Sequence, residues 1–153
     1  MVAINHDLDH LDASAGHESV LHKLVIRQQP KRSRVGCISE RVDRRPVDPP
    51  PIIQLVMDKQ SQGAGTDPDE PSYTLSPHFI MRATLVDKDD EKEISRIRGD
   101  TVPALSGMVV SSLHTLCDLD MVQGAYFVFG DLSVRLEGSF KLRFDLFEIL
   151  GQV

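Results

Sequence analysis

Apolar and charged residues alternate most regularly near the end of the chain, in the stretch "GSFKLRFDLFEI". The apolar positions are Phe140, Leu142, Phe144 and Leu146, and the charged positions between them are Lys141, Arg143 and Asp145. A period of two places one set of side chains on a core and the other set in water. We therefore predict a long, half-buried strand whose Phe and Leu side chains face inward.

Other segments are also rich in branched and aromatic apolar residues and are bounded by Pro, Gly or charged turns, which is typical of strands. They are Leu24–Gln28, Ile52–Met57, His78–Asp87, Leu105–Leu116 and Ala125–Leu136. Residues 94–98 fit either a short helix or an edge strand. About seven short strands with little helix predict an all-β protein, an antiparallel sandwich with long loops, rather than an α/β fold. Within these strands Gly107, Gly124 and Gly130 are expected to be bends or bulges.

A length of 153 residues with 41% apolar content is enough for one domain with a sizeable core. Residues 1–19 carry His, Asp, Ala, Ser and Gly without an apolar period, so we predict a flexible N-terminal arm and a globular domain over residues 20–153. No apolar run reaches the roughly 18 to 20 residues of a membrane span, and the first residues do not resemble a secretory signal. We expect a soluble, intracellular protein without membrane contact.

Metal and disulfide chemistry find little support in the sequence. The spacing of His6, His10, His17 and His22 matches no compact metal site. Two cysteines, Cys37 and Cys117, cannot build a disulfide framework and supply too few ligands for a metal, so we expect reduced structural thiols.

Positive charge is concentrated in one part of the chain. Between Lys23 and Arg45 eight Lys or Arg stand against two acidic residues, a charge of +6, whereas the whole chain carries −6 and the remainder therefore −12. A polyanion would be repelled by most of the molecule and attracted to this segment. The segment leaves a predicted strand, which Pro30 ends, and it runs into Pro49, Pro50 and Pro51, which form a stiff entry to the next strand. A solvated charged loop is the alternative interpretation of such a run.

An enzyme is the other functional class to consider. Ser111, Ser112, His114 and Asp118 are close in sequence, but no G-x-S-x-G nucleophile elbow is present. We interpret them as a hydroxyl cluster beside a partly buried histidine. The "GAG" at residues 63–65 lacks the following Lys of a phosphate-binding loop, so we predict no enzymatic activity, no small-molecule substrate and no nucleotide cofactor.

Several blocks of the sequence together resemble the velvet domain of fungal regulators, especially its VosA-like branch. These blocks, in order, are "LVIRQQPKRSR", "DRRPVDPPPIIQL", "FIMRATL", "SGMVVSSLH" and "GAYFVFGDLSVRLEGSFKLRFDLFEIL". The resemblance implies a β-sandwich similar to the DNA-binding, immunoglobulin-like domain of Rel (NF-kappa-B) proteins. It implies a nuclear regulator of transcription, with a possible cytoplasmic pool, that acts in fungal development, sporulation and secondary metabolism. It also implies homodimers or heterodimers with another velvet protein that bind double-stranded promoter DNA.

The resemblance further implies that the basic segment is the DNA-contacting loop. Its candidate residues are Arg27, Lys31, Arg32, Arg34, Arg41, Arg44 and Arg45. Arginine suits bidentate contact with guanine edges or phosphates, and Lys31 suits a simple phosphate contact. Arg44 and Arg45 have an equally weighted alternative, in which they fix the loop through Asp43 or Asp48.

Two departures from the family pattern affect these expectations. The sequence reads "VGCISE" where the family usually has "VCGFG", so the loop shape is expected to differ. Velvet domains also continue beyond the "LFEI" strand, whereas this sequence stops at Val153, and we expect an uncovered edge or apolar patch that favours self-association. The alternative function is a velvet dimerisation module, associating through "AYFVFGDL" or "MVVSSL", that leaves DNA contact to its partner.

Overall fold

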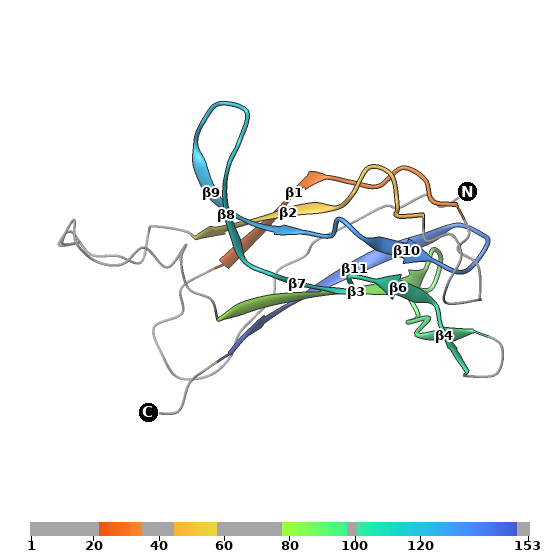
Figure 1. Cartoon of the computed structure of the whole chain (residues 1–153). Coiled ribbons are helices and arrows are strands. Elements are labelled where there is room, and N and C mark those ends of the chain that lie inside the picture. Colours follow the sequence, from red (N-terminus) through yellow and green to blue (C-terminus); the bar gives the residue numbers. More distant parts are fainter. Residues whose placement is uncertain (1–21, 35–44, 58–77, 98–100, 150–153) are drawn as a thin grey trace.

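The structure, a computed structural model, describes residues 22–34, 45–57, 78–97 and 101–149. Within these ranges the chain forms eleven β-strands and no helix, and every pairing between strands is antiparallel (Figure 1). The prediction of an all-β antiparallel protein is confirmed. The predicted N-terminal arm, Cys37, Arg41 and Arg44 lie outside the described residues.

One layer is a four-stranded sheet in the order β1-β2-β9-β8. Its strands are β1 (His22–Gln28), β2 (Ile52–Met57), β9 (Gln123–Val128) and β8 (His114–Cys117). Ile53 of β2 and Phe127 of β9 are paired in register, and both are fully buried. This pairing places the centre of the sheet against the core.

The other layer contains a three-stranded sheet in the order β11-β3-β7. β11 (Phe140–Glu148) pairs with β3 (Phe79–Asp87) along its whole length, and β7 (Val110–Ser112) pairs with the opposite edge of β3. Two short pairs complete the fold. They are β10 (Leu132–Val134) with β6 (Leu105–Gly107), and β4 (Arg96–Ile97) with β5 (Val102–Pro103).

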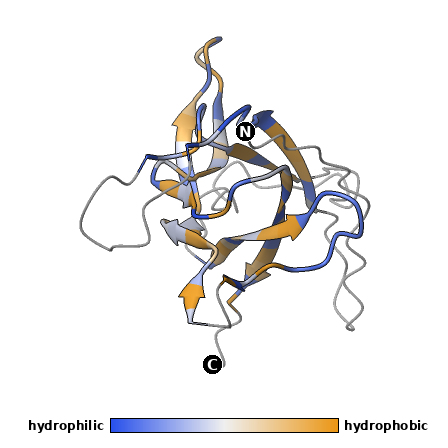
Figure 2. Ribbon diagram, turned by 90° about the vertical axis from the view of Figure 1, so that its right-hand side faces the viewer, coloured by the Kyte–Doolittle hydropathy of each residue, from blue (hydrophilic) through white to orange (hydrophobic). Residues whose placement is uncertain are grey.

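The core lies between the two layers seen in Figure 1. Strands of both layers contribute hydrophobic segments, coloured orange in Figure 2. The rings of Phe129, after β9, and Phe144, on β11, meet with centroids 5.2 Å apart and an interplanar angle of 44°. Tilted packing of this kind is favourable for aromatic pairs and joins the layers. The architecture is a β-sandwich.

The predicted facing of β11 is confirmed. Phe140, Leu142 and Phe144 are buried, and Leu146 is partly buried and packs on the same core. The segment at 94–98 contains the short strand β4 rather than a helix.

Two long predicted strands are broken into shorter ones. Residues 105–116 form β6, β7 and most of β8, which belong to three different sheets, and Gly107 makes the first bend with a φ of 82°. Residues 125–136 divide into β9 and β10 around a turn at Gly130. The expected bends at Gly107 and Gly130 are confirmed, whereas Gly124 lies within β9 and pairs with Leu116. Local hydrophobicity does not encode which sheet the chain joins after each bend.

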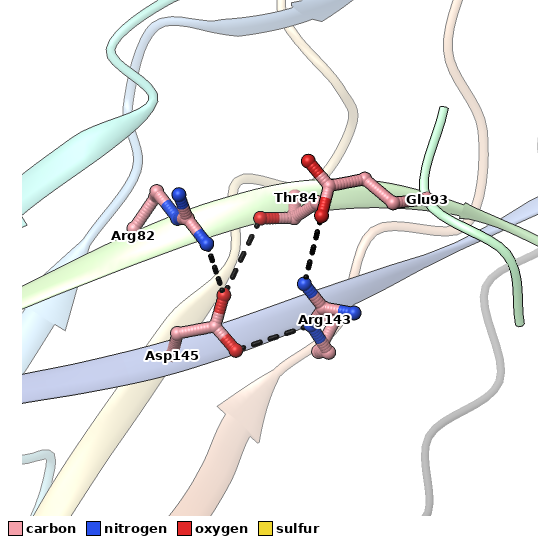
Figure 3. A network of polar contacts seen from close by, with 5 residues as sticks. All are labelled: Arg82, Thr84, Glu93, Arg143 and Asp145. Atoms are coloured by element: carbon pink, nitrogen blue, oxygen red, sulfur yellow. Dashed lines mark hydrogen bonds and ion pairs between the residues drawn. The ribbon is translucent and has the colours of Figure 1, made fainter. Parts of the chain in front are cut away.

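The outer face of β3 and β11 carries a connected ion network (Figure 3). The Asp145 carboxylate accepts hydrogen bonds from Arg82 at 3.0 Å, from the Thr84 hydroxyl at 3.4 Å and from Arg143 at 3.1 Å. Arg143 also donates to Glu93 at 3.2 Å. Burial alone would lower the pKa of Arg143, but hydrogen bonds and attraction from Asp145 and Glu93 outweigh it and raise that pKa. Arg143 is therefore part of a network and not an isolated surface residue.

Candidate nucleic-acid interface

The candidate interface begins with an irregularity at the end of β1. Ile26 pairs with Ile53 and Gln28 pairs with Ile52, which leaves Arg27 as an extra residue in the strand. A bulge of this kind bends the strand and redirects the side chain. Arg27 is exposed, and its guanidinium lies 3.7 Å from the Asp118 carboxylate in the turn between β8 and β9.

Beyond β1, the chain is fixed to the segment that precedes β2. Pro30 is buried. The carbonyl oxygen of Asp48 accepts hydrogen bonds from the backbone N–H groups of Lys31 at 2.9 Å and Arg32 at 3.1 Å, and Asp48 N–H donates to the Arg32 carbonyl at 2.8 Å. These bonds form a small antiparallel bridge. Residues 31–34 are thus held against residues 45–48.

The proline segment is fixed to the body of the sandwich. Val47 is 1% exposed, and its N–H donates to the Leu132 carbonyl at 2.7 Å. Pro51 is buried, and its carbonyl accepts from Phe129 N–H at 3.1 Å. Gln28 also donates its side-chain amide to the Pro50 carbonyl at 2.7 Å. Each anchor reduces the conformational entropy that the neighbouring cations would lose on binding a ligand.

A hollow of about 360 Å³ opens between the two segments. We call it the arginine hollow, and it is lined by Arg32, Ser33, Arg34, Arg45, Pro46 and Asp48. Three of the seven predicted DNA-contacting residues therefore meet there, although Arg32 and Arg45 are separated by a long stretch of sequence. Lys31 is exposed next to the hollow, and Arg41 and Arg44 lie outside the residues that the structure describes.

The cations differ in how far their charge is compensated. Asp48 accepts two hydrogen bonds from Arg32 through one oxygen, Oδ2, from Nε at 3.1 Å and from Nη2 at 3.0 Å. By contrast, the side chains of Lys31 and Arg34 make no hydrogen bond or ion pair in the described part of the chain. Among the described cations in and next to the hollow, Lys31 and Arg34 thus have the most available positive charge.

The sequence indicated Asp48 only as a possible partner of Arg44 or Arg45, and the structure pairs it with Arg32. No sequence signal identifies this pairing, because it depends on the backbone bridge between segments 16 residues apart. The fixed position of Val47 was also missed, although a valine between charged residues and prolines is a weak signal of a buried anchor.

The serine, histidine and aspartate cluster near β7 and β8 has structural roles. Ser111 Oγ accepts a hydrogen bond from Val128 N–H and donates one to the Ser112 carbonyl, both at 3.1 Å. Asp118 Oδ1 accepts from the N–H groups of Asp120 and Val122, both at 2.9 Å. The expectation of a partly buried histidine is wrong, because His114 is exposed on an edge strand.

Cys117, expected to be a structural thiol, is free and exposed. Within the residues that the structure describes, no group of His, Cys, Asp and Glu is arranged to hold a metal ion. The same residues include no helix suited by length and apolarity to crossing a membrane.

The family model of the velvet factor matches residues 22–99 and 93–152, which include both sheets and the arginine hollow. The chain belongs to the velvet family. The resemblance inferred from the sequence blocks is confirmed.

Curated relatives match most of the chain. It is 42% identical over 132 residues to the spore development regulator RYP2 of Ajellomyces capsulatus, covering 86% of this chain and 30% of the relative. It is 43% identical over 130 residues to the spore development regulator VOSA of Pyricularia oryzae, covering 84% and 24%. A protein of Chaetomium globosum that is named as part of the velvet complex is 40% identical over 127 residues, covering 83% and 26%. The chain thus spans less than a third of the length of these relatives, whose names describe regulators and a component of a complex.

Proposed function

We propose that this velvet chain is a sequence-specific DNA-binding regulator of transcription in fungal development, sporulation and secondary metabolism. The observation that carries the proposal is the arginine hollow, where Arg32, Arg34 and Arg45 converge beside the uncompensated Lys31 on an anchored backbone. The names of the relatives, spore development regulators among them, support the biological setting.

Electrostatics favours a polyanionic partner at this place. Neutralising phosphates with Lys and Arg releases counterions, which supplies much of the affinity for DNA. The rest of the chain carries a net charge of −12 outside the +6 segment, so a duplex is repelled elsewhere and oriented towards the hollow.

The proposal includes a nuclear location, with a possible cytoplasmic pool, because promoter DNA is the partner. It also includes assembly as a homodimer or as a heterodimer with another velvet protein. The Chaetomium globosum relative, whose name places it in the velvet complex, supports assembly of this kind.

The salt dependence of duplex binding tests the proposal. We expect the double variant Lys31→Ala with Arg34→Ala to flatten the slope of log affinity against log salt by about 1.8, near 0.9 per phosphate contact. The control is Lys88→Ala with Lys92→Ala, which removes two exposed cations from the turn after β3, in the other layer. This control should leave the slope within error of the parent.

The alternative is a dimerisation module that regulates transcription through a DNA-binding partner. It predicts a different result in the same experiment. A folded Lys31→Ala, Arg34→Ala variant with the affinity and the salt slope of the parent would reject direct binding by this chain. Repeating the titration with a second velvet protein would then show whether DNA binding appears only in the heterodimer.

A further inference from the structure

The arginine hollow contains a carboxylate, which a site for phosphate alone does not need. The side chains of Arg32 and Asp48 are 72% and 62% exposed, so their ion pair contributes little to folding stability. The backbone bridge between the same two residues already holds the segments together. The side-chain pair therefore has its main consequence for a ligand that enters the hollow.

The pair leaves a defined set of donors and acceptors for such a ligand. A guanidinium has five N–H donors, and Arg32 uses Nε and one hydrogen of Nη2 on Asp48 Oδ2. About three donors stay available on the Nη side, the edge that makes bidentate contacts. Asp48 Oδ1 has no partner in the described part of the chain and remains an acceptor. Two of these donors are neighbours on the edge formed by Nη1 and Nη2, so the ion pair offers a ligand two adjacent donors on Arg32 and one acceptor on Asp48.

A G·C base pair presents the complementary pattern in the major groove. Guanine offers N7 and O6 as neighbouring acceptors, and the paired cytosine offers the N4 amino group as a donor. An A·T pair presents acceptor, donor and acceptor in that order, which would leave the fork of Arg32 facing a donor. A phosphate has acceptors only, and Asp48 would repel it.

We propose that Arg32 and Asp48 together read one G·C base pair, with Arg32 contacting guanine N7 and O6 and Asp48 Oδ1 accepting from cytosine N4. Asp48 is also a positioning residue, because it fixes the plane of the Arg32 guanidinium. Lys31 and Arg34 contact phosphates and supply affinity without base preference. This inference rests on the proposed function and adds the base that the site selects.

The test is a selection from a pool of duplexes randomised over about ten base pairs, of the length that one domain can cover. The parent should enrich a G·C pair at one position by roughly 5- to 150-fold over A·T. Asp48→Asn keeps the backbone bridge and removes the charge, and Arg32→Lys keeps the charge and removes the planar fork. Both should lose the preference at that single position and keep the preferences elsewhere.

Affinity for the unselected pool measures general electrostatic attraction to DNA, because this pool has no fixed sequence. It can therefore be compared with the base preference found in the selection. We expect Asp48→Asn to bind this pool as tightly as the parent or more tightly, because a repulsive charge is lost. Asp120→Asn, which removes an exposed charge from the turn between β8 and β9, should change neither the selected sequence nor the preference. Thermal unfolding establishes that each variant is folded.

Each result has a distinct meaning. The inference is overturned if Asp48→Asn and Arg32→Lys select the same base pair as sharply as the parent, or if the parent shows no base preference. In the first case a salt slope that depends on Lys31 and Arg34 would keep the proposed function intact. In the second case the same slope would still support direct DNA binding by this chain, but without sequence specificity. A parent without affinity for any duplex would reject the proposed function and the inference together.

Discussion

Two glycines next to turns differ in whether their positions can accept a side chain. Gly107 has a φ of 82°, and a Cβ there would overlap the carbonyl oxygen of Asp131, whereas a Cβ at Gly130 would meet nothing within 4 Å. We expect Gly107→Ala to lower the free energy of unfolding by more than about 1 kcal/mol, because both conformation and space are unfavourable. Gly130→Ala should be neutral or stabilising by about 0.4–1 kcal/mol. Chemical denaturation of both variants checks this, and equal effects would contradict the bend at Gly107.

Two phenylalanines of β11 lie on opposite faces of the strand and differ in burial. Phe144 is 5% exposed and packs on Phe129, while Phe147 is 44% exposed, with Arg82 lying 5.7 Å from its ring centroid. Phe144→Ala should cost about 3–5 kcal/mol of stability because it opens a cavity in the core. Phe147→Ala should cost about 1 kcal/mol or less, mainly from the lost cation–π contact. Urea titrations with similar midpoints for the two variants would show that the assigned facing is wrong.

At the scale of elements, the turn between β8 and β9 is organised by one side chain. Asp118 accepts hydrogen bonds from two backbone N–H groups in the turn and lies beside Arg27 on β1. We expect Asp118→Ala to increase hydrogen exchange at the amides of Asp120 and Val122, since each lost bond contributes about 1 kcal/mol locally. The core strand β3 should keep its protection.

Asp120→Ala is the matched control, because it removes a neighbouring carboxylate that makes no turn hydrogen bond in the described structure. Faster exchange in both variants would indicate a general loss of charge and would argue against a specific role for Asp118.

At the scale of the whole molecule, the surface has a cluster of exposed apolar residues in addition to its uneven distribution of charge. Leu119, Met121 and Val122 of the same turn are 103%, 80% and 60% exposed. Exposed groups of this kind favour association. We expect light scattering to show concentration-dependent self-association of the purified chain that added salt does not weaken, because apolar contacts are not screened.

The double variant Leu119→Gln with Met121→Gln should reduce this association, while Lys88→Gln with Lys92→Gln should not. A parent that stays monomeric across the concentration series would be incompatible with the expectation, as would association that salt abolishes.

The sequence by itself determined the fold class, the inward face of β11, the family and the basic segment. Each of these follows from local information: a period of two in residues 140–146, blocks of matching residues and a count of charges. The glycines at 107 and 130 marked two of the breaks in the segments 105–116 and 125–136, but the tertiary structure alone decided which sheet each resulting strand joins, because closing a sandwich depends on partners that are distant in sequence. It also decided which cations remain available for a ligand. A bulge places Arg27 near Asp118, and a backbone bridge places Arg32 on Asp48, whereas the charges of Lys31 and Arg34 are not compensated by an acidic partner in the described residues. No local pattern of residues distinguishes these two pairs of cations.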